Sequence, residues 1–355
     1  MANKKSIPDR LKIGLQSAWY KRGLLPFLIV TPLWPLSQIY KFLAFTHRQL
    51  YQFGVLKAHK VSVPVVVVGN IVAGGGGKTP TVIALVQHLQ AQGMQVGVIS
   101  RGYGRTSTEC LEVNKDSTIS DVGDEPACIL IACSAPVFVA KSRFKAASSL
   151  LKIYPNTQVI LSDDGLQHHA MQHDIAVTVF DDRGLGNGLM LPAGPLRESQ
   201  VKANNSLVLH TGNQAAKLTS TAALQFTAHR ALASYALKAD GSKVNLNELN
   251  LIADASKKPL LALAGIANPE AFFDMLRVQG LNLAKTLSLP DHYDFDSTLG
   301  NEYGVYNLIC TEKDAVKLWP QYPDALAVPL EFEPEAAFFK AFDAMLKLRL
   351  HPSLL

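Results

Sequence analysis

One stretch of the sequence decides the fold: Val65-Val66-Val67-Val68-Gly69-Asn70-Ile71-Val72-Ala73-Gly74-Gly75-Gly76-Gly77-Lys78-Thr79-Pro80. Four β-branched residues in a row predict a buried strand. Glycines follow, and Lys78-Thr79 then opens an apolar helical pattern that runs through Leu89. Because a phosphate-binding loop requires a strand, a glycine-rich loop and a helix in this order, the stretch predicts binding of a nucleoside triphosphate.

Each part of this loop has a physical use. Glycines allow backbone N–H groups to crowd around phosphate oxygens, and the new helix adds its positive N-terminal end. Lys78 can reach the β- and γ-phosphates, and the Thr79 hydroxyl can bind Mg²⁺. Val72 stands where the strict pattern has its first glycine, and Ala73 stands where a related variant often has lysine. A flexible turn is the alternative, but the order of the elements favours nucleotide binding.

Composition sets broad limits on the function. The length of 355 residues predicts two domains, and 48% hydrophobic with 18% charged residues indicates a folded chain. The net charge of +5 suits an anionic substrate or a membrane surface and does not by itself indicate nucleic acid. The cysteines (Cys110, Cys128, Cys133 and Cys310) form no CxxC pair, so neither zinc nor a disulfide framework is predicted.

The N-terminal segment is basic and then apolar, with three prolines in the run 24–36. A secretory signal is disfavoured, because no small-x-small cleavage site follows and the chain should work where ATP is. The run is also shorter than the roughly 20 residues of a membrane-spanning helix. We predict an interfacial anchor over residues 1–60, with Trp19, Tyr20, Trp34 and Tyr40 at headgroup level. An apolar arm packed on the main domain is the open alternative.

From Val63 to about His210, strand and helix patterns alternate, which predicts a mostly parallel, doubly wound α/β sheet of the phosphate-loop type. We expect strands at 63–68, 95–99, 136–139, 158–161, 175–180 and 206–210, and helices near 78–92, 124–133, 142–152 and 196–203. Ligands on such sheets bind at the carboxyl ends of the strands.

The residue pattern changes near Asn213. A strand pair is expected at 224–237, a strand–glycine–helix unit at 259–278 and a terminal helix at 334–349. We therefore predict a nucleotide-binding domain over 61–212 and a smaller α/β domain, with its linker, over 213–355, facing the first across a cleft.

Acidic residues follow two predicted elements. Asp163 and Asp164 end an apolar strand, where a carboxylate can hold Mg²⁺, although Asp-Gly pairs also close ordinary turns. Successive residues point to opposite sides, so only one of the two should face Thr79 squarely. Asp124 begins a helix, where it can either complement the helix dipole or act as a general base, and its local sequence does not separate these roles.

Two basic loops follow strands and can bind phosphate or carboxylate, or can be solvated: Arg101-Gly102-Tyr103-Gly104-Arg105 and Lys141-Ser142-Arg143. In Gly194-Pro195-Leu196-Arg197-Glu198 a Gly-Pro pair precedes a predicted helix start, where Arg197 or Glu198 can face the triphosphate and its metal. His168, His169 and His173 are close enough in sequence for a transition-metal site, but a compact loop is favoured. A guanine-specific motif with correct spacing is lacking, which favours ATP over GTP.

An ordered set of short motifs resembles the tetraacyldisaccharide 4′-kinase family (lipid A 4′-kinases). The first half of the chain carries Gly69-Asn70, Gly77-Lys78-Thr79-Pro80, Ser100-Arg101-Gly102-Tyr103-Gly104-Arg105, Gly123-Asp124-Glu125-Pro126, Asp163-Asp164-Gly165-Leu166-Gln167-His168 and Gly194-Pro195-Leu196-Arg197-Glu198. The second half carries Ala264-Gly265-Ile266-Ala267-Asn268-Pro269, Asp291-His292 and Thr311-Glu312-Lys313-Asp314-Ala315-Val316-Lys317. The set spans nearly the whole chain. The loop departs from the family at Gly76, where a threonine-like residue is usual.

The resemblance implies an ATP- and Mg²⁺-dependent lipid kinase that phosphorylates the 4′-hydroxyl of a tetraacyldisaccharide 1-phosphate in lipid A biosynthesis. It implies action at the cytoplasmic face of the bacterial inner membrane, as a peripheral or monotopic protein. The partners are then the lipid substrate and the membrane surface, without nucleic acid. It also implies that Asp124 is the base, with His292 of the second domain beside it, and that the domains close over ATP.

The matching motifs also assign the site residues. Nucleotide binding is expected from Val72, Ala73, Gly74, Gly75, Gly76, Gly77, Lys78, Thr79, Arg143, Gln167 and Arg197. Lipid binding is expected from Asn70, Arg101, Gly102 and Tyr103, and Mg²⁺ binding from Thr79, Asp163, Asp164 and Glu198. Lys78, Asp124 and His292 are the expected catalytic residues.

Two other functions stay open at this point. One is a phosphate-loop NTPase that serves as a metallochaperone or assembly factor through His168, His169 and His173. The other is a soluble small-molecule kinase with a purely structural N-terminal arm.

Overall fold

The protein is described by a computed structural model that covers residues 7–21, 23–74, 76–199, 205–212, 215, 218, 223–266, 268–291, 293, 295 and 303–350. Gly75 and His292, both expected site residues, lie outside the described residues. The chain divides into two compact units. The first unit comprises Met1–Lys78, Gln158–Ala228 and Pro334–Leu355, and the second comprises Thr79–Thr157 and His229–Glu333.

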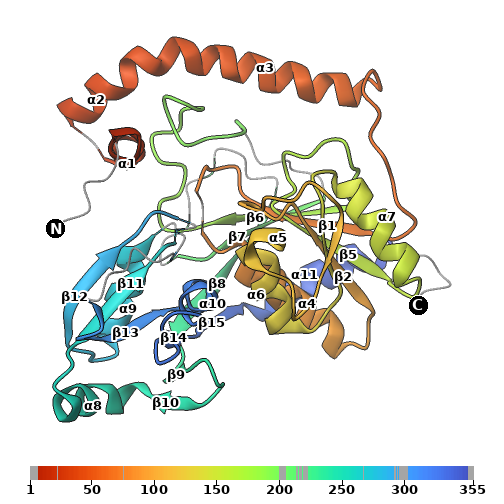
Figure 1. Ribbon diagram of the computed structural model, residues 1–355. Helices are drawn as coiled ribbons and strands as arrows, with labels where there is room; N and C mark the ends of the chain where they lie inside the picture. Colours follow the sequence, from red (N-terminus) through yellow and green to blue (C-terminus); the bar gives the residue numbers. More distant parts are fainter. Residues whose placement is uncertain are drawn as a thin grey trace. The chain divides into compact units, whose positions relative to one another are not determined.

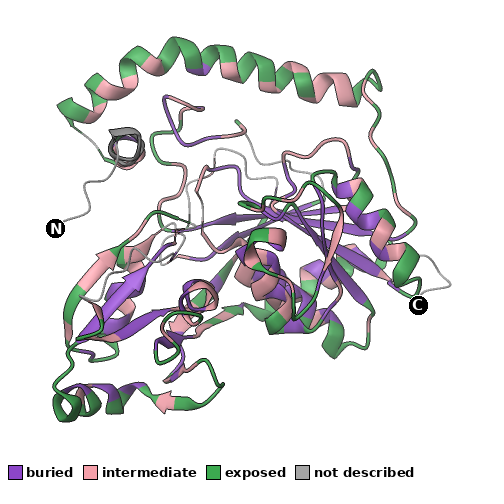
Figure 2. Cartoon of the chain, viewed as in Figure 1, coloured by how far each residue is buried: buried purple, intermediate pink, exposed green. Residues whose placement is uncertain are grey.

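Parallel strands form the centre of the first unit (Figure 1). They are β1 (Val65–Gly69), β5 (Val159–Asp163), β6 (Ile175–Phe180), β7 (Ser206–His210) and β8 (Leu224–Leu232), in the order β8-β7-β6-β1-β5. Every residue of β1, β5, β6 and β7 is buried, which explains the unbroken apolar runs in the sequence (Figure 2). The helix α11 (Ala336–Lys347) buries Phe338, Phe342 and Leu346 in this unit, and the Phe338 ring meets Phe226 of β8 edge-on.

The N-terminal part of the first unit is helical. It consists of α1 (Ile7–Tyr20), α2 (Leu24–Val30), the 3₁₀-helix η1 (Thr31–Leu33) and α3 (Trp34–Gln52). Two side chains bind it to the loop that follows β6: Trp19 Nε1 donates to the Pro192 carbonyl at 3.0 Å, and Ser37 Oγ donates to the Met190 carbonyl at 2.7 Å. The expectation that Trp19 lies at headgroup level is wrong, because this side chain is buried against the rest of the unit.

Most large apolar side chains of α2 and α3 are exposed, as the green stretches of these helices show (Figure 2). They are Leu24, Leu25, Phe27, Leu28, Trp34, Leu36, Ile39, Phe42, Leu43 and Phe45. No residue of α2 is buried, and Ser37 is the buried residue of α3. An arm packed on the core would bury these side chains, so their exposure disfavours that alternative.

Within the described part of the chain, no single helix has both the length and the apolar character needed to cross a membrane. Two helical segments, Gly14–Tyr20 and Leu24–Gln52, are separated by a sharp bend, and they meet those criteria only when they are counted as one span.

The second unit begins with alternating helices and strands. Its helices are α4 (Lys78–Ala91, which starts at the last residue of the first unit), α5 (Ile119–Val122), α6 (Asp124–Cys133) and α7 (Arg143–Ile153). Its strands are β2 (Val96–Ser100), β3 (Leu111–Val113) and β4 (Val137–Val139), with β4 parallel to β2 and antiparallel to β3. At Gly97 a Cβ would come within 2.6 Å of Leu150, so glycine allows β2 and α7 to approach closely.

The rest of the second unit is a six-stranded sheet with the order β10-β9-β14-β13-β11-β12. The strands are β9 (Tyr235–Leu237), β10 (Lys243–Asn245), β11 (Leu260–Ala264), β12 (Leu283–Ser288), β13 (Asn307–Thr311) and β14 (Leu326–Val328). Outside this sheet, the remaining elements of this part of the chain are η2 (Leu246–Glu248), α8 (Leu249–Ser256), α9 (Pro269–Val278), α10 (Glu312–Leu318) and β15 (Leu330–Pro334). Two apolar clusters surround Ala262 and Leu263, consecutive residues of β11 that point to opposite faces.

The predicted α/β class with mostly parallel strands is confirmed, and the predicted elements lie within a few residues of the observed ones. The helix expected at 196–203 is wrong for residues 196–199, which are not helical, and its remaining residues lie outside the described ones. Instead, Leu196 forms a bridge with Val72, and Ala73 N donates to the Pro195 carbonyl at 2.8 Å. The backbone groups of this stretch are thus used by the phosphate loop. The domain boundaries stay a prediction.

Candidate functional site

The loop after β1 has the backbone shape that the glycines predict. Gly74 and Gly77 have φ angles of 67° and 92°, in the region that favours glycine. A Cβ on Gly77 would lie 2.8 Å from Thr211 Oγ1, so no larger residue fits there. Before the loop, Asn70 is 1% exposed, and its Oδ1 accepts from Val72 N at 2.7 Å. Asn70 therefore fixes the backbone where the loop begins, whatever else it contacts.

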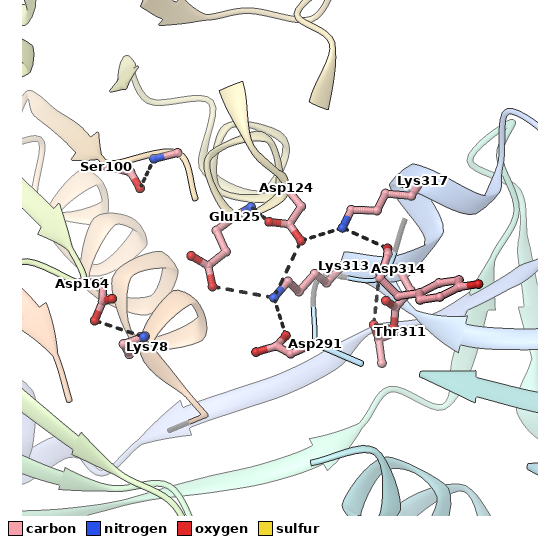
Figure 3. Close-up of polar contacts among 12 residues, drawn as sticks. Lys78, Ser100, Asp124, Glu125, Asp164, Asp291, Thr311, Lys313, Asp314 and Lys317 are labelled. Atoms are coloured by element: carbon pink, nitrogen blue, oxygen red, sulfur yellow. Dashed lines mark hydrogen bonds and ion pairs between the residues drawn. The ribbon is translucent and has the colours of Figure 1, made fainter. Parts of the chain in front are cut away.

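Lys78 opens α4 and forms an ion pair with Asp164, with Nζ 3.1 Å from Oδ1 (Figure 3). Arg197 Nη1 lies 3.4 Å from the other oxygen of the same carboxylate. The two successive acids have different surroundings: Asp163 ends β5 and is fully buried, whereas Asp164 lies beyond the strand with φ 47°. The difference arises from this turn of the backbone and not from the alternation of side chains along a strand. Asp164 is thus the acid placed between two cations.

Gln167 joins the loop to the segment that ends in Glu198. Its Nε2 donates to the Asn70 carbonyl at 3.2 Å and to Glu198 Oε1 at 2.9 Å, and Arg197 Nη1 donates to its Oε1 at 3.5 Å. The backbone N–H of Arg197 donates to the Ile71 carbonyl at 2.7 Å. The structure therefore gathers residues from three separated motifs beside one phosphate loop. We call this group the phosphate-loop site: Asn70, Lys78, Asp164, Gln167, Arg197 and Glu198.

The donor atoms of this group suit Mg²⁺. Asp163, Asp164 and Glu198 offer carboxylate oxygens, and oxygen is the donor that this hard cation prefers. Glu198 and Asp164 are brought together through Gln167 and Arg197, although 33 residues separate Asp164 from Arg197. The hydroxyl of Thr79 follows Lys78 in the first turn of α4.

The other expected nucleotide contacts have varied surroundings. Val72 is buried, whereas Ala73, Gly74, Gly76 and Gly77 are half-buried. Arg143, in the second unit, is 4% exposed in the first turn of α7, where Ser142 Oγ accepts from Lys145 N. The solvated-loop alternative therefore does not apply to Arg143.

Asp124 is the first residue of α6 and is 2% exposed. Its Oδ1 accepts from Glu125 N at 2.9 Å, and its Oδ2 lies 3.0 Å from Lys317 Nζ and 3.8 Å from Lys313 Nζ. Both lysines come from α10, within the same unit (Figure 3). A carboxylate that only complements a helix dipole lies at the surface, so this burial under two cations shows that Asp124 has a specific environment.

Lys313 holds three carboxylates together. Its Nζ lies 3.7 Å from Glu125 and 3.2 Å from Asp291, in addition to Asp124 (Figure 3). Burial by itself would lower the pKa of Lys313, but the carboxylates of Glu125, Asp124 and Asp291 outweigh it and raise that pKa well above its usual value. The lysine therefore stays charged at any ordinary pH. We call Asp124, Glu125, Asp291, Lys313 and Lys317 the Asp124 cluster.

The start of α10 is fixed by Asp314. Its Oδ2 accepts from the Gly265 N–H at 3.0 Å and from Thr311 Oγ1 at 2.7 Å, and Thr311 in turn caps the helix. Burial raises the pKa of Asp314 above its ordinary value, against these hydrogen bonds. The Lys317 ammonium also donates to the Tyr293 carbonyl at 3.3 Å. These contacts hold the helix that supplies both lysines.

The loop with Arg101, Gly102 and Tyr103 lies against the residues that precede Asp124. A Cβ on Gly102, whose φ is 66°, would come within 2.5 Å of the Val122 carbonyl oxygen. Arg105 is used structurally, since it donates to the carbonyls of Val139 and Glu109. Arg101 and Tyr103 are exposed. The expected lipid contacts of this loop thus border the start of α6.

The histidine cluster has weaker structural support. The ring of His169 lies 5.8 Å from that of His47 and 6.1 Å from that of Tyr51. No group of three or more His, Cys, Asp or Glu side chains suited to a metal ion occurs among the described residues.

Sequence reasoning missed the roles of Lys313 and Lys317, and it missed Asp181 and Arg183 entirely. The two lysines lie in one of the quoted motifs, at a spacing of four residues that places both on one face of a helix, and this spacing was the available signal. Asp181 and Arg183 directly follow β6, at the same edge of the sheet as the phosphate loop.

Comparisons with known proteins show the family of the chain. The family model of tetraacyldisaccharide-1-P 4′-kinases matches residues 29–347. The chain is 52% identical to the tetraacyldisaccharide 4′-kinase of Polaromonas naphthalenivorans (strain CJ2) over 344 residues, which cover 95% of each protein. It is 48% identical to that of Acidovorax ebreus (strain TPSY) over 339 residues, or 96% of each. The crystal structure of LpxK from Aquifex aeolicus in complex with ATP is similar, with a TM-score of 0.73 and 25% identity, over 91% of this chain and 100% of that one.

Proposed function

Because the chain belongs to the tetraacyldisaccharide-1-phosphate 4′-kinase family, we propose that it transfers the γ-phosphate of ATP to the 4′-hydroxyl of a tetraacyldisaccharide 1-phosphate in lipid A biosynthesis. The observation that carries the proposal is the gathering of Asn70, Lys78, Asp164, Gln167 and Arg197 beside a glycine-rich loop. That arrangement suits a triphosphate, and the matching relatives are named for this reaction.

The phosphate-loop site binds and positions ATP. The glycine-rich loop and the positive N-terminal end of α4 bind the phosphate oxygens, and Lys78, Arg143, Gln167 and Arg197 add cationic and amide donors. The N–H groups of Val72, Ala73 and Gly76 are not part of this set, because they donate to Asn70, Pro195 and Asp181. Thr79, Asp163, Asp164 and Glu198 would hold Mg²⁺, which neutralises charge on the phosphates. Lys78 stabilises the charge on the phosphoryl group as it moves from ADP to the acceptor.

Asp124 acts as the general base, and His292 beside it is a prediction from the family resemblance. The proton of the 4′-hydroxyl passes to Asp124 while the sugar oxygen bonds to the γ-phosphorus, and the bond to the β–γ bridging oxygen breaks to release ADP. Asn70, Arg101, Gly102 and Tyr103 contact the lipid substrate.

We propose that the exposed apolar side chains of α2 and α3 bind a membrane surface, and the substrate chemistry favours the cytoplasmic face of the inner membrane. Ile39 and Phe42 are 55% and 66% exposed, and Asp at both positions should abolish flotation with anionic vesicles. Asp at Gln38 and Gln52, two exposed polar positions of the same helix, is the matched control. Equal loss of flotation in both double variants would show that added charge alone is responsible.

The decisive experiment is ATP-dependent phosphorylation of a tetraacyldisaccharide 1-phosphate in detergent micelles, followed by mass spectrometry. We expect an added phosphate at the 4′-position. ATP hydrolysis without an acceptor, together with stoichiometric metal binding, would favour the metallochaperone alternative. Equal activity on a deacylated sugar would favour a soluble small-molecule kinase.

A further inference from the structure

Asp181 contacts the phosphate loop but is not one of the residues of the phosphate-loop site. It follows β6 and is 8% exposed. Its Oδ2 accepts from the backbone N–H of Gly76 at 2.8 Å, and a Cβ on Gly76 would touch the same oxygen at 3.4 Å. A buried carboxylate therefore lies directly against the glycine run.

Arg183 completes this contact. Its guanidinium pairs with Asp181, with Nη2 2.6 Å from Oδ2 and Nε 3.2 Å from Oδ1, and its Nη2 also donates to the Gly74 carbonyl. Burial by itself raises the pKa of Asp181, but the Arg183 guanidinium and the N–H donors outweigh burial and lower that pKa below its usual value. The pair thus holds one carbonyl and one N–H of the loop, two residues apart.

A loop with four glycines needs such contacts more than most loops do. Glycine has the largest backbone freedom of any residue, so this loop loses the most conformational entropy when it takes one shape. Gly76 has no side chain with which to hold its own position, and the family resemblance places a threonine-like residue there. The contacts of the Asp181–Arg183 pair restrict the backbone of the loop, as a side chain at position 76 otherwise would.

The pair is supported in turn by the N-terminal helices. The Arg183 guanidinium lies 5.5 Å from the centre of the Tyr20 ring, at the end of α1. Trp19, beside it, is 6% exposed and is hydrogen-bonded to Pro192. The contacts therefore run from α1 through Arg183 and Asp181 to Gly74 and Gly76.

We propose that Asp181 and Arg183 are positioning residues that hold the four-glycine loop in its phosphate-binding shape, with Tyr20 of α1 as their outer support. In this role the pair acts through the loop backbone, at the Gly76 N–H and the Gly74 carbonyl. This inference rests on the proposed binding of ATP by the same loop. It is therefore tested by ATP binding, separately from transfer to the lipid.

The experiment measures the Kd of ATP by isothermal titration calorimetry for the full chain in detergent. Asp181→Ala and Arg183→Met should each raise Kd about 10-fold, with kcat at saturating ATP changed by no more than about 3-fold. Asp181→Asn keeps an acceptor for the Gly76 N–H but loses the charge, so the Kd of ATP should rise about 3-fold. Tyr20→Leu should raise Kd about 2-fold. Amides of residues 72–77 should exchange hydrogen faster in Asp181→Ala.

Asp182→Asn is the matched control. It removes the same charge one residue further along, at an exposed position, and should leave Kd unchanged. A rescue variant tests the loop-ordering role directly: Gly76→Ala in the Asp181→Ala background should recover about 3-fold in Kd, because alanine restricts the unliganded loop. No such recovery is expected if Asp181 only stabilises the fold.

The inference would be overturned by an unchanged Kd in Asp181→Ala and Arg183→Met, by an equal rise in Kd in Asp182→Asn, or by no recovery in the double variant. Tighter ATP binding in Asp181→Ala would also overturn it, because the carboxylate would then be a competitor of phosphate. These failures are distinct from failure of the proposed function, in which the wild-type chain would bind ATP no better than Lys78→Met.

Discussion

The phosphate loop is built almost entirely from one stretch of backbone, whereas the Asp124 cluster is built from side chains of three separate segments. Within its own stretch, the loop uses positive φ angles at Gly74 and Gly77 and one charged side chain, Lys78. The cluster brings together residues 124–125, 291 and 313–317, and its geometry depends on charge pairing.

This difference predicts how each region responds to change. A backbone site fails when its single essential charge or its shape is lost, and distant side chains matter only if they hold that shape. A cluster of buried charges is interdependent, since removing one member leaves the others uncompensated. Substitutions should therefore affect activity in the loop, and both activity and stability in the cluster.

The largest effect is expected at the loop. Lys78→Met should lower kcat about 1000-fold, or about 4 kcal/mol, because Lys78 supplies the charge that stabilises the moving phosphoryl group. The melting temperature should change little. Steady-state kinetics with the lipid substrate measure the loss, and a variant that keeps more than about one tenth of wild-type turnover would show that this loop is not the catalytic one.

The next effect is expected at Asp124. Asp124→Asn should lower kcat about 100-fold while the Kd of ATP stays within about 2-fold, because the carboxylate accepts a proton only during transfer. Kinetics and calorimetry together separate the two quantities. A large rise in the Kd of ATP would instead make Asp124 a nucleotide or metal ligand.

The predicted partnership of Asp124 with His292 is tested by His292→Ala. It should lower kcat less than Asp124→Asn does, and the double variant should be scarcely worse than Asp124→Asn alone, because the two residues act as a unit. Simple additivity of the two effects would argue against this partnership.

Lys313 should matter mainly for stability. Lys313→Met leaves three carboxylates without their shared cation and should lower the free energy of unfolding by about 2 kcal/mol. Because the pKa of Lys313 is raised in the folded state, its contribution is complete below the ordinary value of 10.5 and is lost only as pH rises through the folded value. The difference from wild type should therefore be constant between pH 7 and pH 9 and shrink above pH 10.5, as denaturant melts would show.

The matched control for this prediction is Lys258→Met, an exposed lysine of the same unit. It should change the free energy of unfolding by less than about 0.5 kcal/mol. Equal losses at Lys258 and Lys313 would mean that the charge cluster does not stabilise the fold.

The smallest effect is expected at Lys317, whose ammonium orients Asp124 at 3.0 Å. Lys317→Met should lower kcat about 10-fold, or about 1.4 kcal/mol, with the Kd of ATP unchanged. Lys317→Arg should recover part of the loss, since it restores a cation at the same position. A variant with normal kcat, or arginine no better than methionine, would make Lys317 a structural contact only.

The sequence by itself determined the α/β class, the phosphate loop and the strand-end position of Asp163 and Asp164. These features depend on contiguous residues: β-branched runs, glycines before Lys78-Thr79 and an acidic pair after an apolar strand. The ordered motifs also carried the family resemblance, which the family match over residues 29–347 confirmed.

Only the tertiary structure decided what surrounds Asp124, because its local sequence equally suits an ordinary helix start. The lysines that pair with it lie about 190 residues further along, and no local pattern encodes a contact at that separation. The same holds for Asp181 and Arg183, whose contact with Gly74 and Gly76 crosses more than 100 residues. Leu196 was expected in a helix but pairs with Val72, since the loop and this segment satisfy each other's backbone groups only when the chain is folded.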